Sequence, residues 1–214
     1  MRLRTLCHLL IGCTLATAEQ PLHAVQTDPL QAMVLTGQNN HGWQVLSAHY
    51  KNILEETGLF EVDVVTSPPP GGDMTDFAPD FSRYDVVVIE YNGDEWPATV
   101  KRSFERYMEH GGGMVYAHAV NHTFTDWPAF NEMMGIGGWG GRDERAGPYV
   151  KYRDGKMVLD HRPGHAGECV DAHAFSVVTR DTAHPIMRGL PSAWLHGTDE
   201  LYSNQRGPAK NMTI

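Results

Sequence analysis

Tyr84–Ile89 (YDVVVI) decides the fold class, because it is an almost unbroken apolar run with three consecutive valines. A strand that is covered on one face alternates apolar and polar residues, whereas a continuous apolar run indicates burial on both faces, as in a parallel sheet. The pattern after it predicts a helix over residues 97–110, which Gly111–Gly113 would end. Met114–His118 then has the composition of the next buried strand.

The same alternation of strand and helix precedes this stretch. Ala32–Thr36 and Phe60–Val65 have the composition of strands, and between them apolar residues recur at helical spacing from Trp43 to Thr57. We therefore expect strands near 32–36, 60–65, 84–90 and 113–118. Together they predict an α/β fold with one doubly wound, mainly parallel sheet.

The pattern is less regular after residue 118. We expect a helix near 127–134, a glycine-rich loop over 135–147, and a hairpin of strands 149–152 and 157–160 around Asp154-Gly155. A further strand is predicted over 175–179. Residues 212–214 resemble the opening of another strand, so we expect the domain to continue beyond Ile214.

The N-terminus has the pattern of an export signal over residues 1–18. Two arginines precede an apolar run from Leu6 to Leu15, and Ala16-Thr17-Ala18 is a small-x-small cleavage site. The sequence thus predicts a signal peptide at 1–18, a linker at 19–31 and one domain at 32–214, in a periplasmic or secreted protein. A buried first helix and lipid attachment at Cys13 are the alternatives.

The overall composition is that of a globular protein, with 41% hydrophobic and 20% charged residues. The formal net charge of -9 argues against nucleic acid and anionic membranes as partners and is compatible with a neutral sugar. No apolar run after the signal is long enough for a membrane span. Cys169 alone remains after cleavage, so no internal disulfide is expected.

Three polar clusters follow predicted strands, at the edge where parallel sheets bind ligands. Each cluster lies directly after one strand, and the alternative for any single residue is an ordinary helix cap. The candidate residues in these clusters are Asn39, Asn40, His41, Glu90, Asn92, His118 and Asn121.

His118 is the strongest of these candidates, because it follows a buried strand at a predicted tight turn. An imidazole can exchange protons near neutral pH, and it can also bind a metal. A buried histidine satisfied by the backbone is the alternative.

A second group of candidates lies in the irregular half of the chain. Arg142 follows Gly140 and Gly141, where a ligand could approach the backbone closely. Trp127 could be a platform for a sugar ring or a core residue. Asp199-Glu200 could be a helix cap or a catalytic pair. The histidine spacings match no compact zinc motif. These candidates are Trp127, Arg142, His173, His184, Asp199 and Glu200.

Several of these runs resemble the trehalose-utilisation (ThuA-like) family, and the resemblance covers residues 32–214. The strongest parts are the stretches HPIMRGLP and DELY. The runs that carry it are His118–Asn121, Trp127–Asn131, Gly135–Trp139, Asp181–Pro191, Trp194–His196, Asp199–Tyr202 and Arg206–Pro208.

The resemblance implies a flavodoxin-like, class I glutamine-amidotransferase-like three-layer sandwich. His118 occupies the position where amidotransferases carry their cysteine, so we expect no glutaminase activity. The family link implies an isomerase, lyase or hydrolase acting on 3-keto-glycosides. A carbohydrate-binding module without activity and a metal-dependent hydrolase are the alternatives.

For a 3-keto-sugar, the expected reaction is proton abstraction beside the carbonyl. His118 would be the base, His41 and Asn121 would donate hydrogen bonds, and Arg142 would orient hydroxyl groups. His173 and His184 would supply a second proton or hold a divalent metal.

Overall fold

The computed structural model describes residues 28–214. The predicted signal peptide at 1–18, with Cys13, lies outside the described residues. The first strand begins at Leu30, two positions before the expected start of the domain. The main elements are β1 (Leu30–Thr36), α1 (Trp43–Glu56), β2 (Phe60–Thr66), β3 (Val86–Ile89), α2 (Ala98–Glu109), β4 (Gly113–Tyr116), α3 (Pro128–Met134), β5 (Tyr149–Arg153), β6 (Lys156–Asp160), β7 (Glu168–Val178) and β8 (Ala193–Ser203).

The four N-terminal strands form one parallel sheet, as predicted, and their order in it is β2-β1-β3-β4. Val34 of β1 pairs with Val64 of β2 on one side and with Val88 of β3 on the other. β3 continues the ladder to β4 through Val88 and Val115. Because all four strands run in the same direction, the loops that follow them meet at one edge of the sheet.

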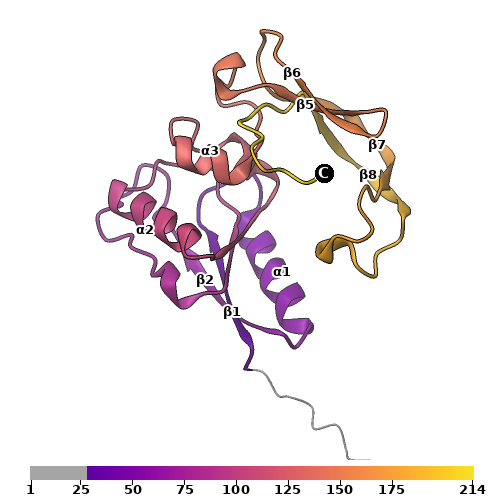
Figure 1. Ribbon diagram of the computed structural model, residues 1–214. Helices are drawn as coiled ribbons and strands as arrows, with labels where there is room; N and C mark the ends of the chain where they lie inside the picture. Colours follow the sequence, from indigo (N-terminus) through magenta and orange to yellow (C-terminus); the bar gives the residue numbers. More distant parts are fainter. Residues whose placement is uncertain (1–27) are drawn as a thin grey trace, which may run out of the picture.

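Helices cover both faces of this sheet, which makes the fold a three-layer sandwich (Figure 1). On one face, Ala32 and Val34 pack with Tyr50 and Leu54 of α1. On the other face, the strands contribute residues such as Met33 to the main core. The helices and loops over this face contribute Phe81, Phe104, Trp127, Phe130 and Met134.

The C-terminal half forms two antiparallel ribbons, β5–β6 and β7–β8. The predicted hairpin at 149–160 is confirmed, and the strand expected at 175–179 is the end of the eleven-residue β7. β8 was not expected. It contains Asp199 and Glu200, so the interpretation of this pair as a helix cap is wrong. The strand opening expected at 212–214 does not form.

The helices are short. α1 has 14 residues and therefore measures about 21 Å. Among residues 28–214, none of the helices has the length and apolar character that crossing a bilayer requires.

Candidate functional site

The loop after β1 is fixed by Gln38, whose side chain is 2% exposed. Its amide donates to the Pro68 carbonyl (2.8 Å) and accepts from the Asp94 N–H (2.8 Å). Its backbone carbonyl accepts from the Asn92 N–H (2.8 Å). One side chain therefore joins the loops that follow β1, β2 and β3. Gly93 leaves room for it, because a Cβ there would lie 2.2 Å from the Gln38 side chain.

His118 lies just beyond the carboxyl end of β4, at the start of a 3-10 turn over His118–His122. Its φ of 43° lies in the left-handed region that residues other than glycine seldom adopt. Such a conformation persists only where the surrounding structure holds it, and it is frequent at functional sites. The turn leaves the His118 side chain 42% exposed.

Three side chains surround Nε2 of His118. Nε2 of His41 lies 3.1 Å away, the Tyr202 hydroxyl 3.0 Å away and Oε2 of Glu200 3.9 Å away. The Tyr202 hydroxyl is also 3.2 Å from Glu200 Oε2. A neutral imidazole has one N–H, so in the pair of facing Nε2 atoms one nitrogen donates and the other accepts. This cluster can therefore hold and pass a proton.

The surroundings favour a neutral His118. Burial lowers the pKa of its imidazole, His41 lowers it further, and the carboxylates of Glu200 and Asp199 act in the opposite direction. Solvent screens part of these effects, because the ring is only partly covered. The pKa of His122 is lowered by burial and then by the charges of His118 and Arg142. A neutral imidazole near pH 7 is available as a base.

The same cluster raises the pKa of the Tyr202 phenol to about 12, through burial first and then through its hydrogen bond to Glu200. The hydroxyl is therefore protonated at neutral pH and can donate a hydrogen bond. The site thus combines a neutral imidazole with a neutral donor.

Aromatic rings form one wall of the site. The Tyr202 ring stacks on His118 at a centroid distance of 5.0 Å and meets Trp139 edge-on at 4.6 Å. The His122 ring lies 4.5 Å from the Trp139 ring, between centroids. The backbone of Trp139 is held in place because its backbone N–H donates to the Ala166 carbonyl (2.9 Å). This wall has the chemistry that binds the apolar face of a sugar ring.

Arg142 lies behind the site and does not face it. Its side chain is 5% exposed, and burial lowers its pKa to about 10. Its guanidinium donates to the carbonyls of Asn121 (2.9 Å) and Thr123 (2.8 Å) and to Oδ1 of Asn131 (2.8 Å). The expectation that Arg142 orients substrate hydroxyls is therefore wrong: its donors are used to hold the 3-10 turn against the glycine-rich loop.

Asn121 is also buried, at 7% exposure, so the structure does not present it as a surface donor. Its backbone carbonyl accepts from the Gly138 N–H (3.1 Å) as well as from Arg142. Within residues 28–214 its side-chain Oδ1 has no hydrogen-bond partner. Asn121 joins two loops of the site through its backbone.

The remaining residues of the first two clusters converge as predicted. Asn39 donates to Glu90 Oε1 (2.6 Å), and Asn92 donates to Asn40 Oδ1 (3.1 Å). Asn40 is exposed, whereas Glu90 is 2% exposed and cannot contact a ligand directly. The substrate-binding role expected for Glu90 is therefore wrong, because the loop residues cover it.

Four other candidates lie in different surroundings. Trp127 is 4% exposed in the main core and donates to Glu105, so it is no sugar platform. His173 is exposed on β7, where its Nδ1 contacts the Asp171 carbonyl. His184 caps a 3-10 turn by accepting from the Ile186 N–H. Asp199 pairs with His196 at 3.1 Å.

A divalent metal ion needs several ligating side chains around one point. Within residues 28–214, no group of three or more His, Cys, Asp or Glu side chains is arranged to hold a metal ion. The donors named for a divalent metal, His173 and His184, have the separate backbone contacts given above. The residues therefore do not fit the metal site that the sequence left open.

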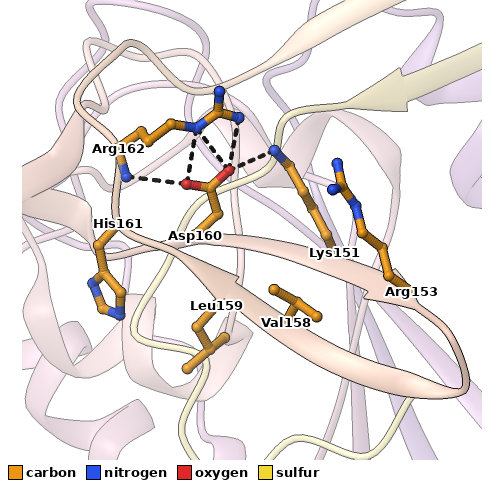
Figure 2. Close-up of a pocket in the computed structure, with 7 residues that line it drawn as sticks. All are labelled: Lys151, Arg153, Val158, Leu159, Asp160, His161 and Arg162. Carbon is orange, nitrogen blue, oxygen red and sulfur yellow. Dashed lines mark hydrogen bonds and ion pairs between the residues drawn. The ribbon is translucent and has the colours of Figure 1, made fainter.

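A cavity of about 690 Å³ lies beside the β5–β6 hairpin. Figure 2 shows the Asp160 carboxylate between Lys151 (2.7 Å) and Arg162 (2.8 Å). These hydrogen bonds hold the pKa of Asp160 well below its usual range. The Asp160 carboxylate is thus occupied by its two neighbours. The lining residues of the cavity are Lys151, Arg153, Val158, Leu159, Asp160, His161 and Arg162.

Three members of the site, Tyr202, Trp139 and His122, received no site role from the sequence, although His122 ends the third polar cluster and Trp139 lies in the glycine-rich group with Trp127. A signal existed for Tyr202, because it follows Glu200 by two positions and residues so spaced share a face of a strand. That signal requires a strand at 193–203, which was not predicted. Trp139 and His122 join the site through loop packing, for which no periodic pattern exists.

Comparison with known proteins agrees with this fold. A family model described as trehalose utilisation (ThuA) matches residues 16–214. A solved structure of a protein described as ThuA-like from Parabacteroides merdae is 47% identical, with a TM-score of 0.83 over 85% of this chain and 65% of that chain.

A second solved structure, of a protein described as ThuA-like from Bacteroides uniformis, is 18% identical. Its TM-score of 0.56, over 86% of this chain and 64% of that chain, supports the fold alone. The present chain thus spans a little under two thirds of each of these structures. No curated protein matches it. With a family match over nearly the whole described chain, the protein belongs to the ThuA (trehalose utilisation) family.

Proposed function

We propose that this ThuA-family protein acts on 3-keto-glycosides of the trehalose type, by removing a proton from the carbon beside the keto group. The observation that carries the proposal is the cluster at the end of β4. There, Nε2 of His118 lies 3.1 Å from His41 Nε2 and 3.0 Å from the Tyr202 hydroxyl. The proposed base, His118, therefore lies within hydrogen-bond distance of two candidate donors, His41 and Tyr202.

In the proposed step, the C–H proton moves to Nε2 of His118. The electron pair of that bond forms a carbon–carbon double bond, and the carbonyl π electrons move to the oxygen. The resulting enediolate is stabilised by hydrogen bonds from Tyr202 and His41. For isomerisation, His118 returns the proton to the former carbonyl carbon while the hydroxyl proton of the adjacent carbon moves to the enolate oxygen, so the carbonyl shifts by one position. For elimination, the electrons on oxygen re-form the carbonyl, the double bond forms toward the anomeric carbon, and the glycosidic oxygen leaves with the electron pair of its bond and takes the proton from His118.

The surroundings suit a neutral sugar. Trp139 and Tyr202 supply aromatic surface, and Asn40 supplies an exposed amide beside His41. The net charge of -9 gives no advantage to an anionic substrate.

The experiment is incubation of the protein with 3-keto-trehalose or a 3-keto-glucoside in D₂O, followed by NMR and product analysis. Proton abstraction predicts deuterium at the carbon beside the keto group, even where net conversion is slow. Binding without deuterium incorporation or product would contradict the proposal. That result would favour the second candidate, a carbohydrate-binding module, to which the aromatic wall is equally suited.

We also propose export of the protein, on the basis of the signal pattern in residues 1–18. The mature chain should begin near Glu19, outside the cytoplasm. Mass spectrometry of the native protein tests this: an intact Met1 terminus contradicts export, and a lipid-modified Cys13 terminus indicates a lipoprotein instead.

A further inference from the structure

Glu90 lies at the carboxyl end of β3 with only 2% of its surface exposed. Burying a carboxyl group costs free energy unless hydrogen bonds compensate for the lost water. Both of its oxygens are engaged: Oε2 accepts from the Thr36 hydroxyl (2.9 Å) and Oε1 accepts from Nδ2 of Asn39 (2.6 Å). The carboxyl group is thus buried but satisfied, next to the loop that carries His41.

Asn39 connects Glu90 to His41. While its Nδ2 donates to Glu90, its Oδ1 accepts from the backbone N–H of His41 (3.0 Å). An amide with both ends engaged is fixed in its orientation. The imidazole of His41 then reaches His118 with an Nε2–Nε2 distance of 3.1 Å. Three hydrogen-bonded links therefore lead from the buried carboxyl to the proposed base.

We infer that Glu90 is a positioning residue that acts through Asn39 to hold His41 against His118. The inference rests on the proposed function of His118 as a base. It assigns Glu90 no contact with substrate, which its burial prevents. Desolvation by burial raises the pKa of Glu90, while the Thr36 hydrogen bond lowers it.

The test compares Asn39→Ala, Glu90→Leu and Glu90→Gln with the unmodified protein. Glu90→Leu removes the acceptor for the Asn39 amide and should lower kcat as Asn39→Ala does. Asn39→Ala cuts the chain of hydrogen bonds at a loop residue, and a displaced His41 should lower kcat by about 10²-fold with little change in KM. Glu90→Gln keeps an oxygen that can accept from Asn39, and the Thr36 hydroxyl can turn to accept from the new amide. As the conservative variant, Glu90→Gln should restore the kcat lost in Glu90→Leu to within about threefold of the unmodified protein.

A second readout needs no substrate. His118 is surrounded by His41 and His122 on the sheet side, and by Asp199, Glu200 and Tyr202 on β8, and His41 lowers its pKa. Displacing His41 in Asn39→Ala should therefore raise the pKa of His118, as measured by NMR titration of the imidazole signals. Glu90→Gln should leave that pKa unchanged.

Thr36→Val is the matched control, because it removes the other hydrogen bond to Glu90 and leaves the link to Asn39 intact. It should lower the thermal midpoint without shifting the pKa of His118. The inference is overturned if a folded Glu90→Leu or Asn39→Ala variant leaves the His118 pKa unchanged, or if Thr36→Val shifts that pKa equally. If the unmodified protein turns over no keto-sugar, the proposed function fails, but the titration still decides whether Glu90 positions His41.

Discussion

The parallel sheet and the β7–β8 ribbon differ sharply in how much they bury. The residues of both hydrophobic clusters lie between 32 and 134, in the sheet and its helices. On the ribbon, Leu195 is 72% exposed and Val178 is 53% exposed. Yet β8 supplies Tyr202, which lies 3.0 Å from the imidazole of His118. The sheet region therefore contains the hydrophobic core, whereas the ribbon contributes a side chain to the proposed reaction. Substitutions in the sheet region should mainly change the free energy of unfolding, and substitutions of Tyr202 should mainly change turnover.

The largest effect is expected from His118→Asn, which keeps a hydrogen-bonding group but removes the proton acceptor. Turnover of a 3-keto-sugar should fall by about 10²–10⁴-fold, while binding changes much less. Steady-state kinetics and calorimetric binding measure the two. His110→Asn is the control, since His110 follows α2 and contacts the Arg106 carbonyl instead of the site. Unchanged turnover with reduced stability would make His118 a packing residue.

The next effect concerns the stability of the sheet region. Phe104 of α2 is fully buried among aromatic rings, so Phe104→Ala should lower the free energy of unfolding by about 3–5 kcal/mol. On the ribbon, Leu195→Ala should change it by no more than about 0.5 kcal/mol. Urea unfolding followed by fluorescence measures both. Equal losses would show that the ribbon contributes to stability as much as the sheet does.

A smaller effect is expected from Tyr202→Phe, which removes the hydroxyl but keeps the ring against His118 and Trp139. Losing one hydrogen bond to the reacting centre should lower kcat by about tenfold and leave the free energy of unfolding nearly unchanged. Tyr202→Ala, which also removes the aromatic surface, should raise KM in addition. A fully active Tyr202→Phe variant would show that the Tyr202 hydroxyl of β8 takes no part in the reaction.

The smallest effect is a pH dependence of stability that arises from the two histidines beside Tyr202, His118 and His122. The folded-state pKa values of His118 and His122 are lowered, so below about pH 6.5 the unfolded chain binds more protons than the folded one. Stability from these groups is complete above that pH and is lost as the pH falls toward the folded-state pKa. Thermal unfolding between pH 7 and pH 5 should therefore show a smaller decline in a His118→Asn/His122→Asn variant, whereas Leu195→Ala should decline like the unmodified protein.

The fold of the N-terminal half could be predicted because its strands are buried on both faces. Val86–Ile89 is a continuous apolar run, and such a run indicates a central parallel strand without any knowledge of its neighbours. β8 could not be recognised in this way. Its eleven residues include Gly197 and two acidic residues, and most of them are exposed, so no core imposes a periodic pattern on them.

The same contrast explains which site residues were expected. The loops carrying His41 and His118 were predicted to meet, because both follow parallel strands of one sheet. The sequence does not show which tryptophan belongs to the site, because Trp127 and Trp139 lie close together in the same irregular stretch. Packing places the first in the core at 4% exposure and leaves the second against Tyr202.

The amino-acid sequence by itself determined the parallel sheet and the edge of that sheet at which His41 and His118 meet. Only the tertiary structure decided that Tyr202 reaches His118 across 84 positions of the chain, and that Arg142 and Glu90 are buried behind the site. The physical reason is the range of the forces involved. Burial of a strand leaves a periodic pattern in neighbouring residues, whereas a contact between distant loops depends on side-chain packing and on hydrogen bonds that leave no such pattern.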